Sequence, residues 1–302
     1  MKGRPFGEKT SGVKDVDLQK RSASALSKLK SAGVPKDLDW FVPDLLRAYE
    51  SMSGPGETAQ VHPYLFTTSI AKLAEEKGAK IAYGGVTDID YSDNTAKSVT
   101  YAEKETGESK TIPVTDVIVS AGPWTRSVLP KAPISATRAH SVVIRPTRPV
   151  SGYTLFTELE IPDESKRGRP LVAAPEIYAR PDETVYCCGD GDRTVPLPKT
   201  TADVEVDPER IEDIVKQVGS ISDELRDGEI SARQACYLPN VTVLQGGPLV
   251  GLTDTKGLYV AAGHTCWGIQ NAPGTGKVMS EFVFDGKAKS AKIGSLDPRN
   301  YM

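Results

Sequence analysis

Residues 263–277 have the sequence GHTCWGIQNAPGTGK. The residues directly before them, LYVAA, have the β-branched and aromatic content of a buried strand. After them, apolar residues recur at three- and four-residue spacing up to Val283, which is a helical pattern, and Gly286 supplies a stop signal. The sequence therefore predicts a strand, a glycine-rich turn and a helix that begins near Ala272, with Pro273 in its first turn.

The start of this helix has a physical consequence for ligand binding. The first turn of a helix presents unpaired N–H groups and a partial positive charge to whatever lies in front of it. Gly263 and Gly268 allow a flat ligand to approach the backbone closely. The stretch therefore predicts a site for an anion, or for a ring that becomes anionic.

A phosphate-binding P-loop is the first alternative for this stretch. That motif requires Gly, four residues, then Gly-Lys and Ser or Thr. Counting back from Gly276 and Lys277, the first glycine position is held by Asn271, and Val278 stands where Ser or Thr is required. The P-loop interpretation fails at these two positions.

The stretch resembles the C-terminal flavin segment of FAD-dependent amine oxidases of the D-amino-acid oxidase and glycine/sarcosine oxidase type. The pattern of that family is Gly-His, three residues, Gly, and then Ala-Pro-x-Thr-Gly at the start of a helix. The matching positions are Gly263, His264, Gly268, Ala272, Pro273, Thr275 and Gly276. The simpler alternative is an ordinary strand-to-helix turn.

The resemblance implies FAD as the cofactor and assigns it binding residues in this turn. The residues so implied are Gly263, His264, Trp267, Gly268, Ile269 and Gln270. We expect the backbone N–H groups of residues 267–269 to face the N1–C2 carbonyl edge of the flavin, where reduced flavin carries negative charge.

A second segment, residues 117–125 with the sequence VIVSAGPWT, resembles the family's strand-Ala-x-Gly-x-Trp-Ser/Thr element. It has one residue fewer than the family between Ala121 and Gly122. The resemblance implies that Ala121, Gly122 and Trp124 lie beside FAD, where small residues at the carboxyl end of a strand leave room for a ligand. It also implies that the backbone of Val86 meets the adenine; the alternative there is a plain strand residue.

The pattern of elements predicts a mixed α/β fold, with an antiparallel substrate-domain sheet inserted into an incomplete FAD-binding, Rossmann-like domain. We expect residues 1–54 to form a lead-in and helical cap region, with helices over 18–29 and 40–49. Residues 55–135 and 245–302 are assigned to a discontinuous FAD-binding domain, and residues 136–244 to the substrate domain. Short strands separated by Pro, Gly and Asp from residue 138 onward favour antiparallel pairing.

Local patterns predict further elements. Helices are predicted from His62 to Lys77 and from Asp207 to Val218, and strands over residues 80–83 and 86–91. Residues 99–101 and 111–114 fit a hairpin, in which Pro113 would mark an edge strand. Cys187 and Cys188 are adjacent in a strand-like segment, so their side chains are expected on opposite faces.

The family's N-terminal strand, G-x-G-x-x-G turn and helix are not found in these residues. Gly54 opens a superficial G-x-G-x-x-A, but a helical and polar segment precedes it rather than a strand. Because that βαβ unit receives the pyrophosphate of FAD, we expect the 302 residues alone to bind FAD weakly or not at all. The central sheet would also expose an apolar edge without it, so we expect this chain alone to fold poorly.

Composition excludes several classes of protein. The chain has 302 residues, 38% of them hydrophobic, and a net charge of −3, which does not point to nucleic acid or to an anionic membrane. It has no apolar run of membrane-spanning length, no signal-peptide core and no C-terminal Ser-Lys-Leu, so we expect a cytoplasmic protein with a small-molecule substrate. Four cysteines without a C-x-x-C pair and three scattered histidines predict neither a disulfide framework nor a metal site.

These features predict an FAD-dependent oxidoreductase that oxidises a C–N bond of an amine or amino-acid-like substrate by hydride transfer to flavin. Amino-acid-specific members of the family carry Leu-Arg-Pro where this chain has Leu238 before Pro239, so the carboxylate-binding arginine is missing from this position. No residue is assigned as the catalytic acid or base.

Cys236 lies close to the position where sarcosine-oxidase-like members attach flavin, although a small buried hydrophobic residue is the simpler interpretation. The alternative function is a catalytically inactive flavin-fold protein that acts as a binding module.

Overall fold

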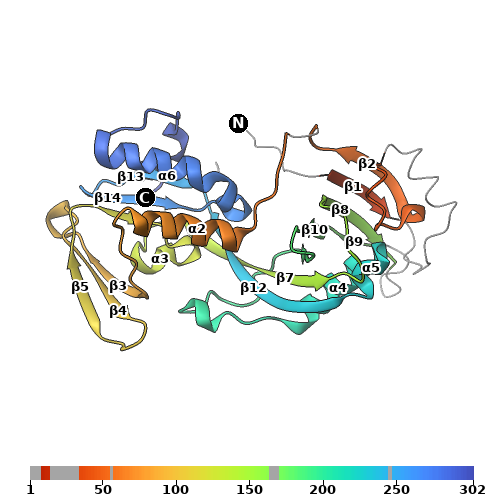
Figure 1. Cartoon of the computed structure of the whole chain (residues 1–302). Coiled ribbons are helices and arrows are strands. Elements are labelled where there is room, and N and C mark those ends of the chain that lie inside the picture. The colour runs from red at the N-terminus through yellow and green to blue at the C-terminus, as the bar shows by residue number, and fades with distance from the viewer. Residues whose placement is uncertain (1–7, 14–33, 55–56, 163–169, 244–246) are drawn as a thin grey trace. The chain divides into compact units, whose positions relative to one another are not determined.

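The computed structural model describes residues 8–13, 34–54, 57–162, 170–243 and 247–302 (Figure 1). The chain divides into two compact units. Unit 1 comprises residues 1–62, 139–191 and 205–236, and unit 2 comprises residues 63–138, 192–204 and 237–302. Each unit is described by itself below.

Unit 1 is built on a sheet with the strand order β12-β7-β11-β10-β8-β1-β2, in which β9 also pairs with β8. The pairs β7–β11, β11–β10, β10–β8, β8–β9 and β1–β2 are antiparallel, which confirms the predicted antiparallel sheet, and β1–β8 is parallel. The strands are β1 (Glu8–Val13), β2 (Leu46–Ser51), β7 (Ile134–Arg145), β8 (Thr154–Ile161), β9 (Leu171–Ala173), β10 (Glu176–Ala179), β11 (Val185–Cys188) and β12 (Glu229–Val241).

One face of this sheet packs on two helices, α4 (Pro208–Ile221) and α5 (Asp223–Arg226). Burial alternates along β10 and β11, as period-2 side-chain direction requires, and Ile177 and Cys187 are fully buried against α4. The Asp207 side chain accepts a hydrogen bond from the Glu209 N–H and caps α4. The predicted helix after Asp207 is therefore confirmed, as is the placement of Cys187 and Cys188 on opposite faces.

The predicted helix over residues 40–49 is wrong. That segment forms a short 3-10 turn, η1 (Pro43–Leu45), and then strand β2. Trp40 and Phe41 are buried in the core of unit 1, and the Trp40 Nε1 donates to Ser151 Oγ at 2.9 Å. Pairing of β2 with β1 and this packing override the local helical spacing. The predicted helix over residues 18–29 lies outside the described residues.

Unit 2 contains a sheet with the order β13-β14-β6, covered by helix α6 (Gly268–Asp285). Its strands are β6 (Val117–Val119), β13 (Leu249–Leu252) and β14 (Leu258–Ala262). Val278, Met279 and Phe282 of α6 pack on Val250 and Tyr259. The helix ends at Gly286, whose φ of 74° is left-handed, so the predicted stop signal is confirmed.

A second sheet in unit 2 is formed by β3 (Gly84–Asp90), β4 (Ser98–Glu103) and β5 (Ser109–Pro113) in that order. It confirms the predicted hairpin and places Pro113 in an edge strand. Residues 80–83 were predicted to form a strand, but they do not. Among the described residues they make only one backbone hydrogen bond, from the Lys104 N–H to the Tyr83 carbonyl, which is too few for strand pairing.

Helix α2 (Pro63–Glu76) confirms the helix predicted after His62, and α3 (Thr125–Val128) follows β6. Leu65, Ile70 and Leu73 of α2 are more than half exposed, at 58%, 53% and 56%. The helices of the described residues include none with the length and apolar content that a membrane span needs.

Candidate functional site

The two segments singled out in the sequence come together at one edge of the unit 2 sheet. Strands β14 and β6 are parallel, with Val260 opposite Val119. Ala121 and Gly122 follow β6, and Gly263 and His264 follow β14, so both loops leave the sheet at its carboxyl edge. This edge is where ligands bind in open α/β sheets.

Both loops contain a glycine with a left-handed backbone conformation. Gly263 has a φ of +89°, and a Cβ built there would lie 2.5 Å from the Val241 Cγ2. Gly122 has a φ of +53°. These backbone conformations are readily adopted by glycine and are costly for other residues.

Helix α6 begins at Gly268 rather than near Ala272, so Pro273 lies inside the helix and its predicted place in the first turn is wrong. A short 3-10 turn, η6 (Thr265–Trp267), leads into the helix. At its interior position Pro273 has no N–H to donate to the preceding turn, which is a local cost to the helix. The Trp267 N–H donates to the His264 carbonyl at 2.9 Å. This N–H is therefore used within the turn, which corrects its expected place among the amides facing flavin.

The N-terminus of α6 retains the property expected of an anion site. No side chain caps the helix at Trp267. The first-turn N–H groups, those of Gly268, Ile269 and Gln270, therefore point out of the helix end without a side-chain acceptor, together with the positive end of the helix dipole. Trp267 and Gln270 are exposed, and Gly268 and Ile269 are half-buried.

His264 is held at the same edge. Its Nε2 lies 3.3 Å from the Thr275 Oγ1 of α6, and its buried Nδ1 has no hydrogen-bond partner among the residues that the structure describes. Burial lowers the pKa of His264 below its ordinary value, so the imidazole is neutral at pH 7. A buried ring nitrogen without a partner fits contact with a polar atom of a bound ligand.

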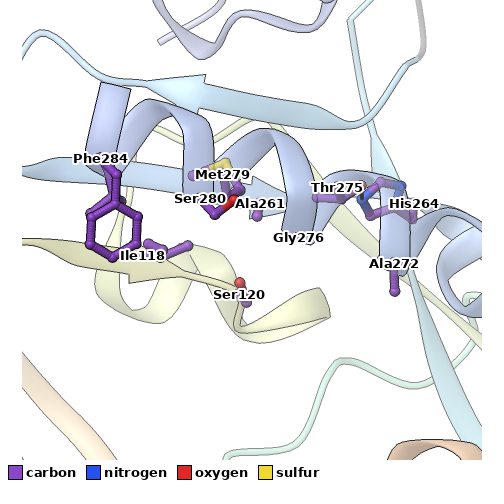
Figure 2. Close-up of a pocket in the computed structure, with 11 residues that line it drawn as sticks. Ile118, Ser120, Ala261, His264, Ala272, Thr275, Gly276, Met279, Ser280 and Phe284 are labelled. Atoms are coloured by element: carbon purple, nitrogen blue, oxygen red, sulfur yellow. Dashed lines mark hydrogen bonds between the residues drawn. The ribbon is translucent and has the colours of Figure 1, made fainter. Parts of the chain in front are cut away.

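A cavity of about 550 Å³ opens beside this edge. It is lined by Ile118 and Ser120, by Ala261 and His264, and by α6 from Ala272 to Phe284. Figure 2 shows His264 and Thr275 at one end of the cavity, and Ile118 and Phe284 at the other. Its volume lies within the range of small-molecule and cofactor sites, and most of its lining residues are apolar.

The other residues predicted to bind FAD are placed differently. The Trp124 Nε1 donates to the Pro198 carbonyl at 2.7 Å, so this side chain holds the loop of residues 192–204. Val86 lies in β3 opposite Tyr101, in the second sheet of unit 2, and is 45% exposed. Helix α3, which follows Gly122, contacts β3.

The cysteines are all free. Cys236 lies in β12 and is exposed as a residue, while desolvation of the thiol group itself raises its pKa. The described residues contain no group of three or more His, Cys, Asp or Glu side chains arranged to hold a metal ion.

Sequence reasoning missed a polar and aromatic cluster on the unit 1 sheet. The Tyr178 hydroxyl donates to Glu176 Oε2 at 2.5 Å, and the Cys188 Sγ lies 3.8 Å from the same oxygen. The Arg180 guanidinium carbon lies 4.9 Å from the centroid of the Tyr186 ring. Polar residues at every second position of β10 could have indicated a polar face of this strand. Only the register with β11 shows that Glu176 and Tyr178 lie opposite Cys188 and Tyr186.

The model of the family described as FAD dependent oxidoreductase, DAO, matches residues 20–282. The chain belongs to this family. It is 37% identical over 326 aligned positions to the Saccharomyces cerevisiae protein named "Putative oxidoreductase TDA3", covering 97% of this chain and 60% of that protein. It is 34% identical to the Schizosaccharomyces pombe protein C1F5.03c over 88% of this chain and 70% of that protein. The chain therefore spans less than two thirds of the length of TDA3.

Solved structures with the same fold include amino acid oxidising enzymes. Glycine oxidase from Geobacillus kaustophilus matches 98% of this chain and 75% of its own, with a TM-score of 0.70 and 17% identity. L-proline dehydrogenase from P. horikoshii matches 98% of this chain and 77% of its own, with a TM-score of 0.64 and 17% identity. At these identities the likeness supports the mixed α/β fold with its antiparallel sheet, and nothing finer.

Proposed function

We propose that this protein is an FAD-dependent oxidoreductase that oxidises a C–N bond of an amine or amino-acid-like substrate. Membership of the FAD-dependent family supports FAD as the cofactor. The observation that supports its binding site is the N-terminus of α6, which has no side-chain cap and lies at the carboxyl edge of β14. When bound, FAD supplies the hydride acceptor, while the protein contributes orientation and electrostatics.

The residues of the turn divide this work between them. The Gly268 and Ile269 N–H groups would stabilise negative charge on the flavin edge, because they are fixed dipoles that need no reorganisation. The His264 Nδ1 would contact a polar atom of the cofactor as a neutral imidazole, consistent with its lowered pKa. Gly122, Ala121 and Gly263 keep bulky side chains away from these positions of the sheet edge.

The remaining assigned residues support the cofactor from further along the chain. The backbone of Val86 in β3 would hold the adenine, and Trp124 would support the edge by its hydrogen bond to the Pro198 carbonyl. Trp267 and Gln270 flank the first turn of α6, and their exposed side chains would border the bound cofactor.

The alternative is a flavin-fold protein that binds a partner without turnover, motivated by the absence of a G-x-G-x-x-G unit from these 302 residues. The two functions differ in product formation. Protein that carries FAD is incubated in air with primary and secondary amines, with and without a carboxylate, and the carbonyl product and hydrogen peroxide are measured against free FAD. We expect product from at least one amine; no product above the free-FAD control from any of them supports the binding module.

A further inference from the structure

Residues 192–204 of unit 2, named here the strap, are held by other elements rather than by strand pairing of their own. The structure describes all of them and none lies in a strand, while one isolated backbone bridge joins Asp192 to Arg138. Pro196 and Pro198 have no N–H to donate to a neighbouring strand. The position of the strap therefore depends on the side chains that bond to it.

The start of the strap is fixed by a buried ion pair. The Arg138 Nε lies 3.2 Å from the Asp192 Oδ2, and the two side chains are 3% and 5% exposed. The Thr194 N–H and hydroxyl donate to the Asp192 Oδ1 at 3.0 Å and 2.6 Å. Because separating a buried ion pair is costly, this end of the strap stays on β7 when the rest of it moves.

The middle of the strap is bonded to the first of the two loops at the sheet edge. The Trp124 Nε1 donates to the Pro198 carbonyl at 2.7 Å, and the Tyr237 hydroxyl donates to the Pro196 carbonyl at 3.1 Å. Trp124 stands two residues after Gly122, in the loop that follows β6. The strap and this loop therefore share a hydrogen bond at their closest point along the chain of contacts.

Thr137 links the strap to the second loop. Its hydroxyl oxygen accepts from the Arg193 Nε of the strap at 3.0 Å and from the Asn240 Nδ2 at 2.7 Å. Asn240 forms an antiparallel backbone bridge with His264, in the turn that follows β14. A hydroxyl oxygen has two lone pairs, so both bonds form at once. A continuous path of bonds thus runs from Arg193 through Thr137 and Asn240 to His264.

We propose that Thr137 is a positioning residue for the cofactor site, and that Thr137 and Trp124 couple the strap to both loops of that site. The inference rests on the proposed function and names the segment that controls how firmly the cofactor is held. Coupling between two sites is reciprocal. A strap that holds the two loops in place is therefore itself held more firmly when FAD is bound, and it is released before FAD leaves.

Lys199 serves as a reporter of strap release, because it is exposed in the strap and trypsin cleaves after lysine. Cleavage of a segment that opens and closes rapidly follows the population of its open form. FAD is expected to slow cleavage after Lys199 by about fivefold or more. Cleavage after Lys80, exposed in the segment that follows α2, is the internal reference and should not change. Mass spectrometry of the released peptides measures both rates in one sample.

Thr137→Val tests the junction, since it removes the hydroxyl and keeps the size of the side chain. It is expected to weaken FAD binding about threefold to tenfold, as the loss of one or two hydrogen bonds would, and to reduce the protection of Lys199 by FAD. Thr137→Ser keeps the hydroxyl and should restore both. Thr111→Val is the matched control, because the Thr111 hydroxyl bonds the Thr100 hydroxyl at 2.9 Å in the second sheet, outside the strap. Urea unfolding of each variant checks that it is folded.

The outcomes separate this inference from the proposed function. FAD that binds and leaves cleavage after Lys199 unchanged overturns the inference, even if amines are oxidised. Thr137→Val that binds FAD as tightly as Thr111→Val overturns it too, as does Thr137→Ser that fails to restore binding. Protection of Lys199 by FAD, with no amine oxidised, supports the strap and contradicts the proposed function instead. Wild-type protein that binds no FAD contradicts both.

Discussion

Gly263 shows how one residue without a side chain shapes the turn. Its φ of +89°, and the 2.5 Å that would separate an added Cβ from the Val241 Cγ2, leave alanine no space. Gly263→Ala is expected to cost about 1–3 kcal/mol of stability, from backbone strain, and to weaken FAD binding, because the turn that leads to α6 must shift. Urea unfolding and fluorescence titration with FAD measure the two effects.

The matched control for this prediction is Gly274→Ala. Gly274 lies inside α6, and a Cβ there meets nothing within 4 Å. Alanine should stabilise the helix by about 0.5–1 kcal/mol. A Gly263→Ala protein with the stability and FAD affinity of wild type would show that the turn tolerates a side chain.

Cys236 is expected to leave the flavin unattached. The raised pKa of its thiol disfavours the thiolate, which is the reactive form. Acid precipitation of the FAD-carrying protein should therefore give a colourless pellet and a yellow supernatant, and Cys236→Ser should retain as much FAD as wild type. A yellow pellet that turns colourless in Cys236→Ser is the contrary result.

Glu281 links the carboxyl-terminal half of α6 to the segment after the helix by hydrogen bonds. This carboxylate is buried, and it accepts from the Lys289 N–H at 2.6 Å and the Ser290 N–H at 3.0 Å. These backbone hydrogen bonds, with help from the Ser290 hydroxyl and Lys277, lower its pKa from 4.5 to about 2.

The lowered pKa gives a defined pH dependence. Because the folded pKa lies below the unfolded one, the stabilisation is complete above the unfolded value of 4.5 and is lost as the pH falls through about 2. At pH 6, Glu281→Gln should have a lower urea midpoint than wild type. At pH 3 the difference between the two midpoints should be smaller. A constant difference between the two proteins from pH 6 to pH 3 would rule out this coupling.

The elements differ in how far the sequence alone could predict them. The hairpin of β4 and β5, helix α4 with Asp207 as its cap, and the strand β14 with its glycine turn follow from local patterns and are present. Strand β2 is not predictable from local spacing, because its conformation depends on pairing with β1 and on the burial of Trp40. The pairing of Glu176 and Tyr178 with residues of β11 likewise depends on register, which alternation within one strand does not specify.

The molecule as a whole has a separate hydrophobic core in each unit. Trp40 belongs to the core of unit 1, and the packing of α6 on β13 and β14 belongs to unit 2. Trp40→Ala should cost about 3–5 kcal/mol and lower the temperature of one calorimetric transition. Excess FAD should raise the temperature of the other, since the proposed FAD site lies in the unit that contains Gly263. A single transition that both changes shift together would show that the units unfold as one.

The most direct measurement is the visible spectrum of the FAD-carrying protein during anaerobic addition of primary and secondary amines, with and without a carboxylate. If the protein oxidises C–N bonds through its flavin, the yellow absorbance bleaches with one amine consumed per flavin, and it returns when oxygen is admitted. A spectrum that stays yellow with every one of these amines, in protein that still holds FAD, would contradict the account.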